Sequence, residues 1–164
     1  MNYIVNITLT GIGATAFVDL WSLVRRQVFG IPLPDYGLVG RWIAYLPRGR
    51  FRHPRINATP GLPGELATGW IAHYSIGIAF AGILAAIPGV AWFAQPAPIP
   101  ALLVGIGTVA APFFVMQPGM GAGIAASRTP RPAAARLQSL ITHALFGVGL
   151  YLGGLAAVLL LPGA

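Results

Sequence analysis

The sequence predicts an all-α protein that crosses a membrane four times. Hydrophobic residues make up 56% of its 164 residues and charged residues only 8%, whereas soluble domains average about 25% charged residues. The mean hydropathy is +0.75, and four apolar runs approach or exceed the ~20 residues that a helix needs to span the hydrocarbon layer. Together these observations exclude a disordered chain, a coiled coil and a soluble enzyme.

The four apolar runs define the predicted helices. They cover residues 3–24, 66–90, 99–117 and 137–161. Asp19 is the only charged residue of the first run, the third is bounded by Pro100 and Pro118, and the fourth contains the titratable His143. No run alternates polar and apolar residues, as the ~10-residue strands of a membrane β-barrel do. We therefore expect a four-helix bundle.

The arginines predict the orientation of this bundle. The chain has ten Arg and no Lys against three acidic residues, a formal net charge of +7. Every Arg lies at or in the connections 25–65 and 118–136, whereas the connection 91–98 and both ends of the chain have none. The positive-inside rule places both Arg-bearing loops in the cytoplasm and both termini outside it. We expect one transmembrane domain over residues 1–164 and no nucleic-acid partner, since little water-exposed surface remains.

The first Arg-bearing loop contains a cluster of basic residues. Its members are Arg48, Arg50, Arg52 and Arg55. We expect them to contact anionic lipid headgroups, and a specific phosphate or polyanion site is the alternative. The preceding segment 36–46 mixes apolar, aromatic and Arg residues, which is typical of a short interfacial helix. His53, within the cluster, is expected to be solvated or to lie at headgroup level.

The second Arg-bearing loop is rich in glycine. Residues 117–128 read QPGMGAGIAASR. These glycines predict either a backbone nest for an anion or a re-entrant turn that packs against the protein. No phosphate-loop fingerprint is complete, because its Lys is missing and no strand precedes it.

Short matches between the spans suggest an internal repeat. Residues 69–77 and 139–147 both read small-x-Ile-x-His-x-x-x-Gly, and Gly-Ile-Gly recurs at 11–13 and 105–107. The chain would then consist of two parallel two-helix hairpins. Coincidence in a biased composition is the alternative.

Three ionisable residues of the spans define a candidate site. Asp19, His73 and His143 each lie six to eight residues from the nearest charged residue of the Arg-bearing loops. At 1.5 Å per residue, all three lie roughly 9–12 Å inward. Because an ionisable group facing lipid costs at least about 2.5 kcal/mol, such groups normally face the bundle interior and pair. We expect one polar layer, with possible support from Thr15, Ser22, Tyr74, Gln117 and Tyr151.

The layer has four possible roles. It is either a hydrogen-bond cluster that fixes helix register, a proton relay or substrate site, a transition-metal site, or a pair of haem ligands at His73 and His143. Small residues four positions before and after each His would leave room for a haem, although they equally allow close helix packing. With no cysteine in the chain, thiolate metal sites and CxxCH haem attachment are excluded.

The chain resembles one bacterial protein family over nearly its whole length. The segments GIGATAFVDLW, GWIAHYSIG and QPGMGAGIAASRTP carry the resemblance. The family consists of small inner-membrane proteins with no assigned function. The resemblance implies a four-helix, multi-pass protein of the bacterial inner membrane, which puts both termini in the periplasm, and it implies no activity.

These observations favour a non-enzymatic role. We expect an accessory or binding subunit that contacts membrane lipids and packs in a homo-oligomer or a larger membrane complex, because Gly- and Ala-rich helices pack closely. The alternative is a small transporter or redox protein that uses Asp19, His73 and His143 as a proton, metal or haem site.

Overall fold

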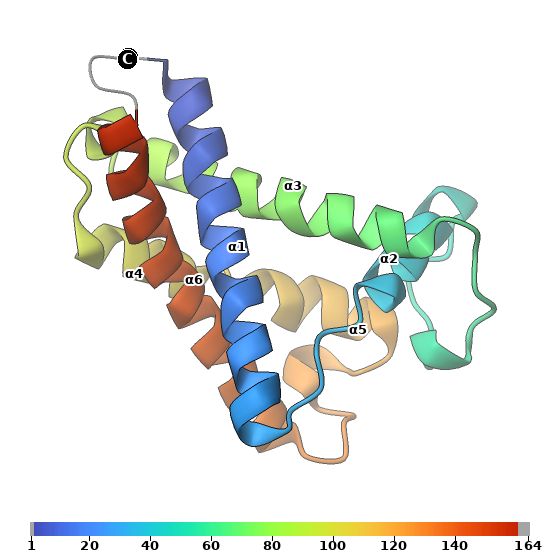
Figure 1. Ribbon diagram of the computed structural model, residues 1–164. Helices are drawn as coiled ribbons and strands as arrows, with labels where there is room; N and C mark the ends of the chain where they lie inside the picture. Colours follow the sequence, from blue (N-terminus) through green and yellow to red (C-terminus); the bar gives the residue numbers. More distant parts are fainter. Residues whose placement is uncertain (1, 161–164) are drawn as a thin grey trace. The chain divides into compact units, whose positions relative to one another are not determined.

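The computed structural model describes residues 2–160, and these residues form helices and connecting segments with no strand. Figure 1 shows the helices in the colours of the sequence. The helices are α1 (Tyr3–Phe29), α2 (Tyr36–Tyr45), α3 (Glu65–Ala86), α4 (Pro98–Gly107), α5 (Gln117–Met120) and α6 (Pro132–Leu160). Short helical turns lie between these helices, at Leu46–Arg48, Ile56–Ala58, Val90–Phe93, Pro112–Met116 and Ile124–Ala126. The all-α prediction is confirmed.

Four helical segments are long and apolar enough to cross a membrane. They are Tyr3–Phe29, Glu65–Ala86, Pro98–Met120 and Pro132–Leu160. Their order and number match the four predicted spans, although several ends differ by a few residues. Residue 161, which ends the predicted fourth span, lies outside the described residues.

The largest differences, five residues each, lie at the end of α1 and at the start of α6, which begins at Pro132 whereas the predicted span starts at residue 137. The predicted span stops at residue 24, but the helix continues to Phe29 and ends at Gly30, whose positive φ of 65° lets its N–H bond to the Arg26 carbonyl. Arg25 is therefore a helical residue of α1 and not a loop residue. Loop assignment by charge failed here because an arginine has a good helix propensity and does not end a helix.

The third span is interrupted after α4. Pro112 has no N–H, so the carbonyl of Thr108 lacks the donor that would continue the α-helix. The Thr108 N–H still bonds to Val104, and the Phe113 N–H bonds to Val109 beyond the break. The chain then passes through a π-helical turn at Pro112–Met116 into α5. Interrupted helices in membrane proteins place backbone polar groups inside the protein.

The chain divides into two compact units. The first comprises Met1–Leu33, Tyr74–Thr108 and Ile141–Ala164, and the second Pro34–His73 and Val109–Leu140. The core of the first unit is built from α1, the end of α3, α4 and the end of α6. Its buried members are Ala14, Val18, Ala81, Leu84, Trp92, Phe93, Ala101, Val104, Phe146 and Leu150.

Glycines set the closest helix contacts of the first unit. A Cβ on Gly11 of α1 would lie 2.5 Å from the Ile78 Cα of α3, and a Cβ on Gly105 of α4 would lie 2.5 Å from the Gly147 nitrogen of α6. The repeat aligns Gly11 with Gly105 and Gly77 with Gly147. The same Cβ on Gly11 would lie 2.9 Å from the Gly77 carbonyl. The contact between α1 and α3 and the contact between α4 and α6 are thus made by glycines that the repeat aligns.

We expect Gly105→Ala to destabilise the first unit because its methyl group would separate α4 from α6. Overpacking of this kind costs about 1–3 kcal/mol. Gly107→Ala is the matched control, since a Cβ at Gly107 meets nothing within 4 Å. Thermal unfolding in mild detergent checks both variants, and equal midpoints for the two would contradict the packing described here.

Candidate functional site

Asp19 is bound to α3 inside the first unit. The Tyr74 hydroxyl donates a hydrogen bond to Asp19 Oδ2 over 3.0 Å. Asp19 lies on α1 and Tyr74 on α3, so the bond joins two spans. Such a bond fixes the register of the two helices, because sliding one helix would leave a carboxylate without its donor in an apolar setting.

His143 is bound to α4 at the interruption of the third span. Its Nδ1 lies 2.9 Å from the Thr108 hydroxyl oxygen, and that hydroxyl donates to the Gly105 carbonyl over 2.6 Å. A hydroxyl has one proton to donate, so the Thr108 oxygen accepts from an Nδ1–H of His143. In the neutral imidazole the proton therefore lies on Nδ1 and the lone pair on Nε2, where it can accept a proton or bind a metal.

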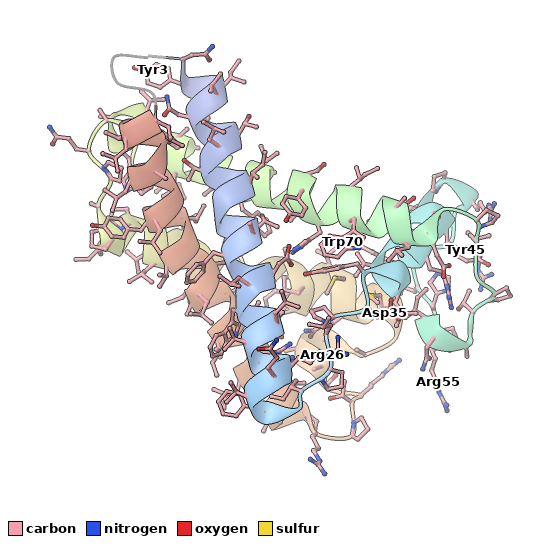
Figure 2. All side chains as sticks on the ribbon, in the orientation of Figure 1. Tyr3, Arg26, Asp35, Tyr45, Arg55 and Trp70 are labelled. Atoms are coloured by element: carbon pink, nitrogen blue, oxygen red, sulfur yellow. The ribbon has the colours of Figure 1, made fainter. Side chains whose placement is uncertain are left out.

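His73 belongs to the second unit. Its Nε2 lies 2.9 Å from the Tyr36 hydroxyl, and the two rings stack with centroids 4.2 Å apart. The Trp70 ring lies 4.5 Å from the Tyr36 ring, and Figure 2 labels Trp70 on α3. Gly69 permits this approach, because a Cβ there would lie 2.6 Å from the carbonyl carbon of Tyr36. The start of α2 and the start of α3 are thereby held together.

Two residues of the predicted layer, Asp19 and His143, lie deeper along their helices than the loop charges implied, whereas His73 lies at the expected depth. Asp19 lies ten residues from the end of α1, His73 eight from the start of α3, and His143 eleven from the start of α6, or roughly 12–17 Å along the helices. Asp19 and His143 belong to the first unit and contact different spans. Among residues 2–160 no group of three or more His, Asp or Glu side chains is arranged to hold a metal ion.

Neighbouring helices pack closely against the glycines that follow each histidine by four residues. A Cβ on Gly147, four residues after His143, would lie 2.9 Å from the Leu102 Cα of α4. Gly77, four residues after His73, packs in the same way against the side chain of Thr15. The space that would admit a haem beside these positions is occupied by helices, which favours the close-packing interpretation.

The supporting residues have structural partners. Thr15 donates from its hydroxyl to the Gly11 carbonyl one turn earlier over 2.8 Å, and Ser22 is buried. Gln117 Nε2 donates to the Ser139 hydroxyl over 3.4 Å within the second unit. The Tyr151 side chain packs against the apolar core of the first unit.

An ion pair organises the second unit. The Arg41 Nε and Nη2 donate to the two carboxylate oxygens of Glu65 over 2.8 and 2.7 Å, and Nη1 donates to the carbonyls of Ile56 and Thr59. Glu65 also accepts from the Leu62 N–H over 2.9 Å. The hydrogen bonds that Arg41 donates to Glu65 raise the pKa of Arg41 above its usual value. One guanidinium therefore ties α2, the loop and the start of α3 together.

His53 is buried, contrary to the expectation of a solvated residue. Only 3% of it is exposed. Its Nδ1 lies 3.1 Å from the Thr59 hydroxyl, which itself donates to the Arg55 carbonyl. Burial, and then the charge of Arg50, lower the pKa of His53. The basic sequence context was misleading because the loop folds back and encloses the imidazole.

The arginines of the basic cluster surround this buried region. Arg48 and Arg50 hold their guanidinium carbons 5.5 and 4.9 Å from the centroid of the Tyr45 ring, at distances typical of cation–π contacts. Arg52 and Arg55 are exposed, and Figure 2 shows Arg55 pointing outward from the loop. All four are exposed and available to contact anionic headgroups.

The glycine-rich loop packs against the basic loop. The His53 N–H donates to the Gly119 carbonyl over 2.8 Å, and a Cβ on Gly119 would lie 2.6 Å from the indole nitrogen of Trp42. Gly121, with a φ of 95°, lies against the backbone of Pro54. The N–H groups of Gly121 and Ala122 bond to carbonyls of α5. This arrangement favours the packed-turn interpretation of the loop over an anion nest.

Sequence reasoning missed two buried hydrogen-bond donors on α1. Arg25 is 6% exposed, and its Nε, like the indole Nε1 of Trp21, is buried with no hydrogen-bond partner in the described structure. Two signals pointed to them. Trp21 and Arg25 are spaced by one helical turn, and the chain has only three acidic residues to pair with ten arginines.

Comparison with known proteins identifies the family of this chain. No curated protein and no solved structure matches it. One family model, described as a protein of unknown function (DUF2938), matches residues 8–157. The match confirms the expected resemblance to a family without an assigned activity. Since it covers nearly the whole chain, the protein belongs to the DUF2938 family.

Proposed function

We propose that this protein is a non-enzymatic accessory or binding subunit of the bacterial inner membrane. It packs there as a homo-oligomer or in a larger membrane complex. The observation that carries the proposal is the use of the polar groups in the spans. Asp19 is bonded by the Tyr74 hydroxyl and His143 by the Thr108 hydroxyl, so both groups serve as links between helices.

The outer faces of the spans support association within the membrane. Large apolar side chains are exposed along α1 and α6, including Ile4, Ile12, Leu20, Leu23, Leu137, Ile141, Leu152 and Leu159. In a bilayer such faces contact lipid or another membrane protein. Small residues bring helix backbones close together in these assemblies, and the first unit already relies on contacts of this kind.

The distribution of arginine supports a cytoplasmic position for the loops. In the structure the ten arginines lie in the final two turns of α1, in the two loops, and at or before the second turn of α6. Figure 2 labels Arg26 near the end of α1. We therefore propose periplasmic termini and cytoplasmic Arg-bearing loops.

Single cysteines test this orientation directly, because the natural chain contains none. We expect Ala94→Cys, in the connection between α3 and α4, to react with a membrane-impermeant maleimide in intact spheroplasts. Asn57→Cys, in the basic loop, should react only after lysis. Both positions are exposed. The opposite labelling pattern would contradict the orientation.

A second candidate function rests on His143. The Thr108 hydroxyl fixes its Nδ1–H tautomer, so its Nε2 carries a lone pair beside the interrupted third span. Interrupted helices form binding sites in transporters, and a neutral imidazole is a metal ligand and a proton acceptor. This observation favours a proton or metal site in a transporter or redox protein.

The assembly state separates the two candidates. We expect the protein, purified in mild detergent, to have a mass of at least two chains, or of one chain with a stoichiometric membrane partner, by light scattering and native mass spectrometry. His143→Phe should leave that mass unchanged. Absorption spectra and metal analysis of the same samples provide the comparison. A solitary monomer carrying a metal or haem that His143→Phe removes would contradict the subunit role and favour the second candidate.

A further inference from the structure

Arg25 is a buried arginine that forms no ion pair within residues 2–160. It lies four residues before the end of α1 and only 6% of it is exposed. Its Nε has no hydrogen-bond partner among residues 2–160. An arginine stays protonated in proteins, and an unpaired buried charge is costly. The negative end of the helix dipole offsets only part of that cost.

Trp21 presents a second buried donor on the same side of α1. Its Nε1 is buried and unpartnered in the described structure. Residues spaced by four lie on one face of a helix, so the Trp21 indole and the Arg25 guanidinium lie on the same side of α1. Both groups are donors only and cannot satisfy each other. Whatever satisfies them must bring acceptor atoms.

Each acidic side chain of the sequence has another partner in the described structure. The carboxylate of Asp19 accepts from Tyr74, and that of Asp35 caps α2 by accepting from the Leu38 N–H. The carboxylate of Glu65 is taken up by the guanidinium of Arg41. These are the three acids of the sequence, and among residues 2–160 the recorded ion pair joins Glu65 to Arg41 and none joins an acid to Arg25.

We propose that Trp21 and Arg25 form a binding site for a phosphate group. A phosphate supplies anionic oxygens to both donors, and arginine binds it through paired N–H groups. The site lies in the last three turns of α1, at the end of the helix that contains Arg25 and Arg26. Two sources offer this chemistry there, namely the headgroup of an anionic phospholipid and a soluble phosphate anion. The site is independent of the subunit role proposed above.

Neighbouring variants on α1 test the site. Arg25→Gln removes the charge, and Arg26→Gln is the matched control, because Arg26 is exposed on the same helix. Trp21→Phe removes the indole donor and keeps an aromatic ring. One measurement is the phosphatidylglycerol retained by each variant after exchange into detergent, by native mass spectrometry. The other is the shift in unfolding temperature on adding inorganic phosphate, compared with chloride at equal ionic strength.

We expect Arg25→Gln to bind phosphatidylglycerol or phosphate at least about tenfold more weakly than Arg26→Gln, with Trp21→Phe in between. Loss of retained phosphatidylglycerol identifies the lipid as the source, and loss of the phosphate-induced shift identifies a soluble anion. Equal behaviour of Arg25→Gln and Arg26→Gln in both measurements would overturn the proposal. If Arg25→Gln does not fold, Trp21→Phe decides, and binding equal to that of the natural chain would overturn it.

Discussion

In an apolar environment, a polar side chain inside a span needs a hydrogen-bond partner within the protein, and this constraint determines how the spans are joined. The Tyr74 hydroxyl is the partner of Asp19, and the Thr108 hydroxyl is the partner of His143. Each bond links two spans and so fixes their register. The distance between the helices is set separately, by glycines such as Gly105 that allow backbones to touch. In the first unit, polar bonds thus determine the register of the helices and small residues determine the distance between them.

The second unit meets the same requirement with charge. Its loops contain Pro and Gly at many positions and cannot satisfy their backbone by helix formation alone. Arg41 compensates by binding the Glu65 carboxylate and two loop carbonyls at once. The backbone N–H of His53 links its own loop to the glycine-rich loop by donating to the Gly119 carbonyl. Arg25 on α1 follows neither pattern, since its buried Nε has no acceptor among the residues that the structure describes. The unpartnered Nε of Arg25 is therefore a candidate contact for a ligand.

Hydropathy alone predicted the four spans, because a stretch of about 20 apolar residues has few other uses. The same composition, with its Gly-rich helices, predicted close packing. The partners of the polar residues were less accessible to sequence reasoning. Tyr74 was recognised as a candidate from its position, but the pairing of His143 with Thr108 depends on where Pro112 interrupts the third span. The burial of His53 depends on how a long loop folds, and such long-range contacts leave no periodic signal.

Polar bonds between spans stabilise the first unit, and a double-mutant cycle on Asp19 and Tyr74 measures this stabilisation. Asp19→Leu removes the acceptor, Tyr74→Phe removes the donor, and Tyr151→Phe serves as a control for loss of a tyrosine hydroxyl. Unfolding free energies in detergent should give a coupling of about 0.5–2 kcal/mol between Asp19 and Tyr74, and none between Asp19 and Tyr151. Additive effects for Asp19 and Tyr74 would contradict the account.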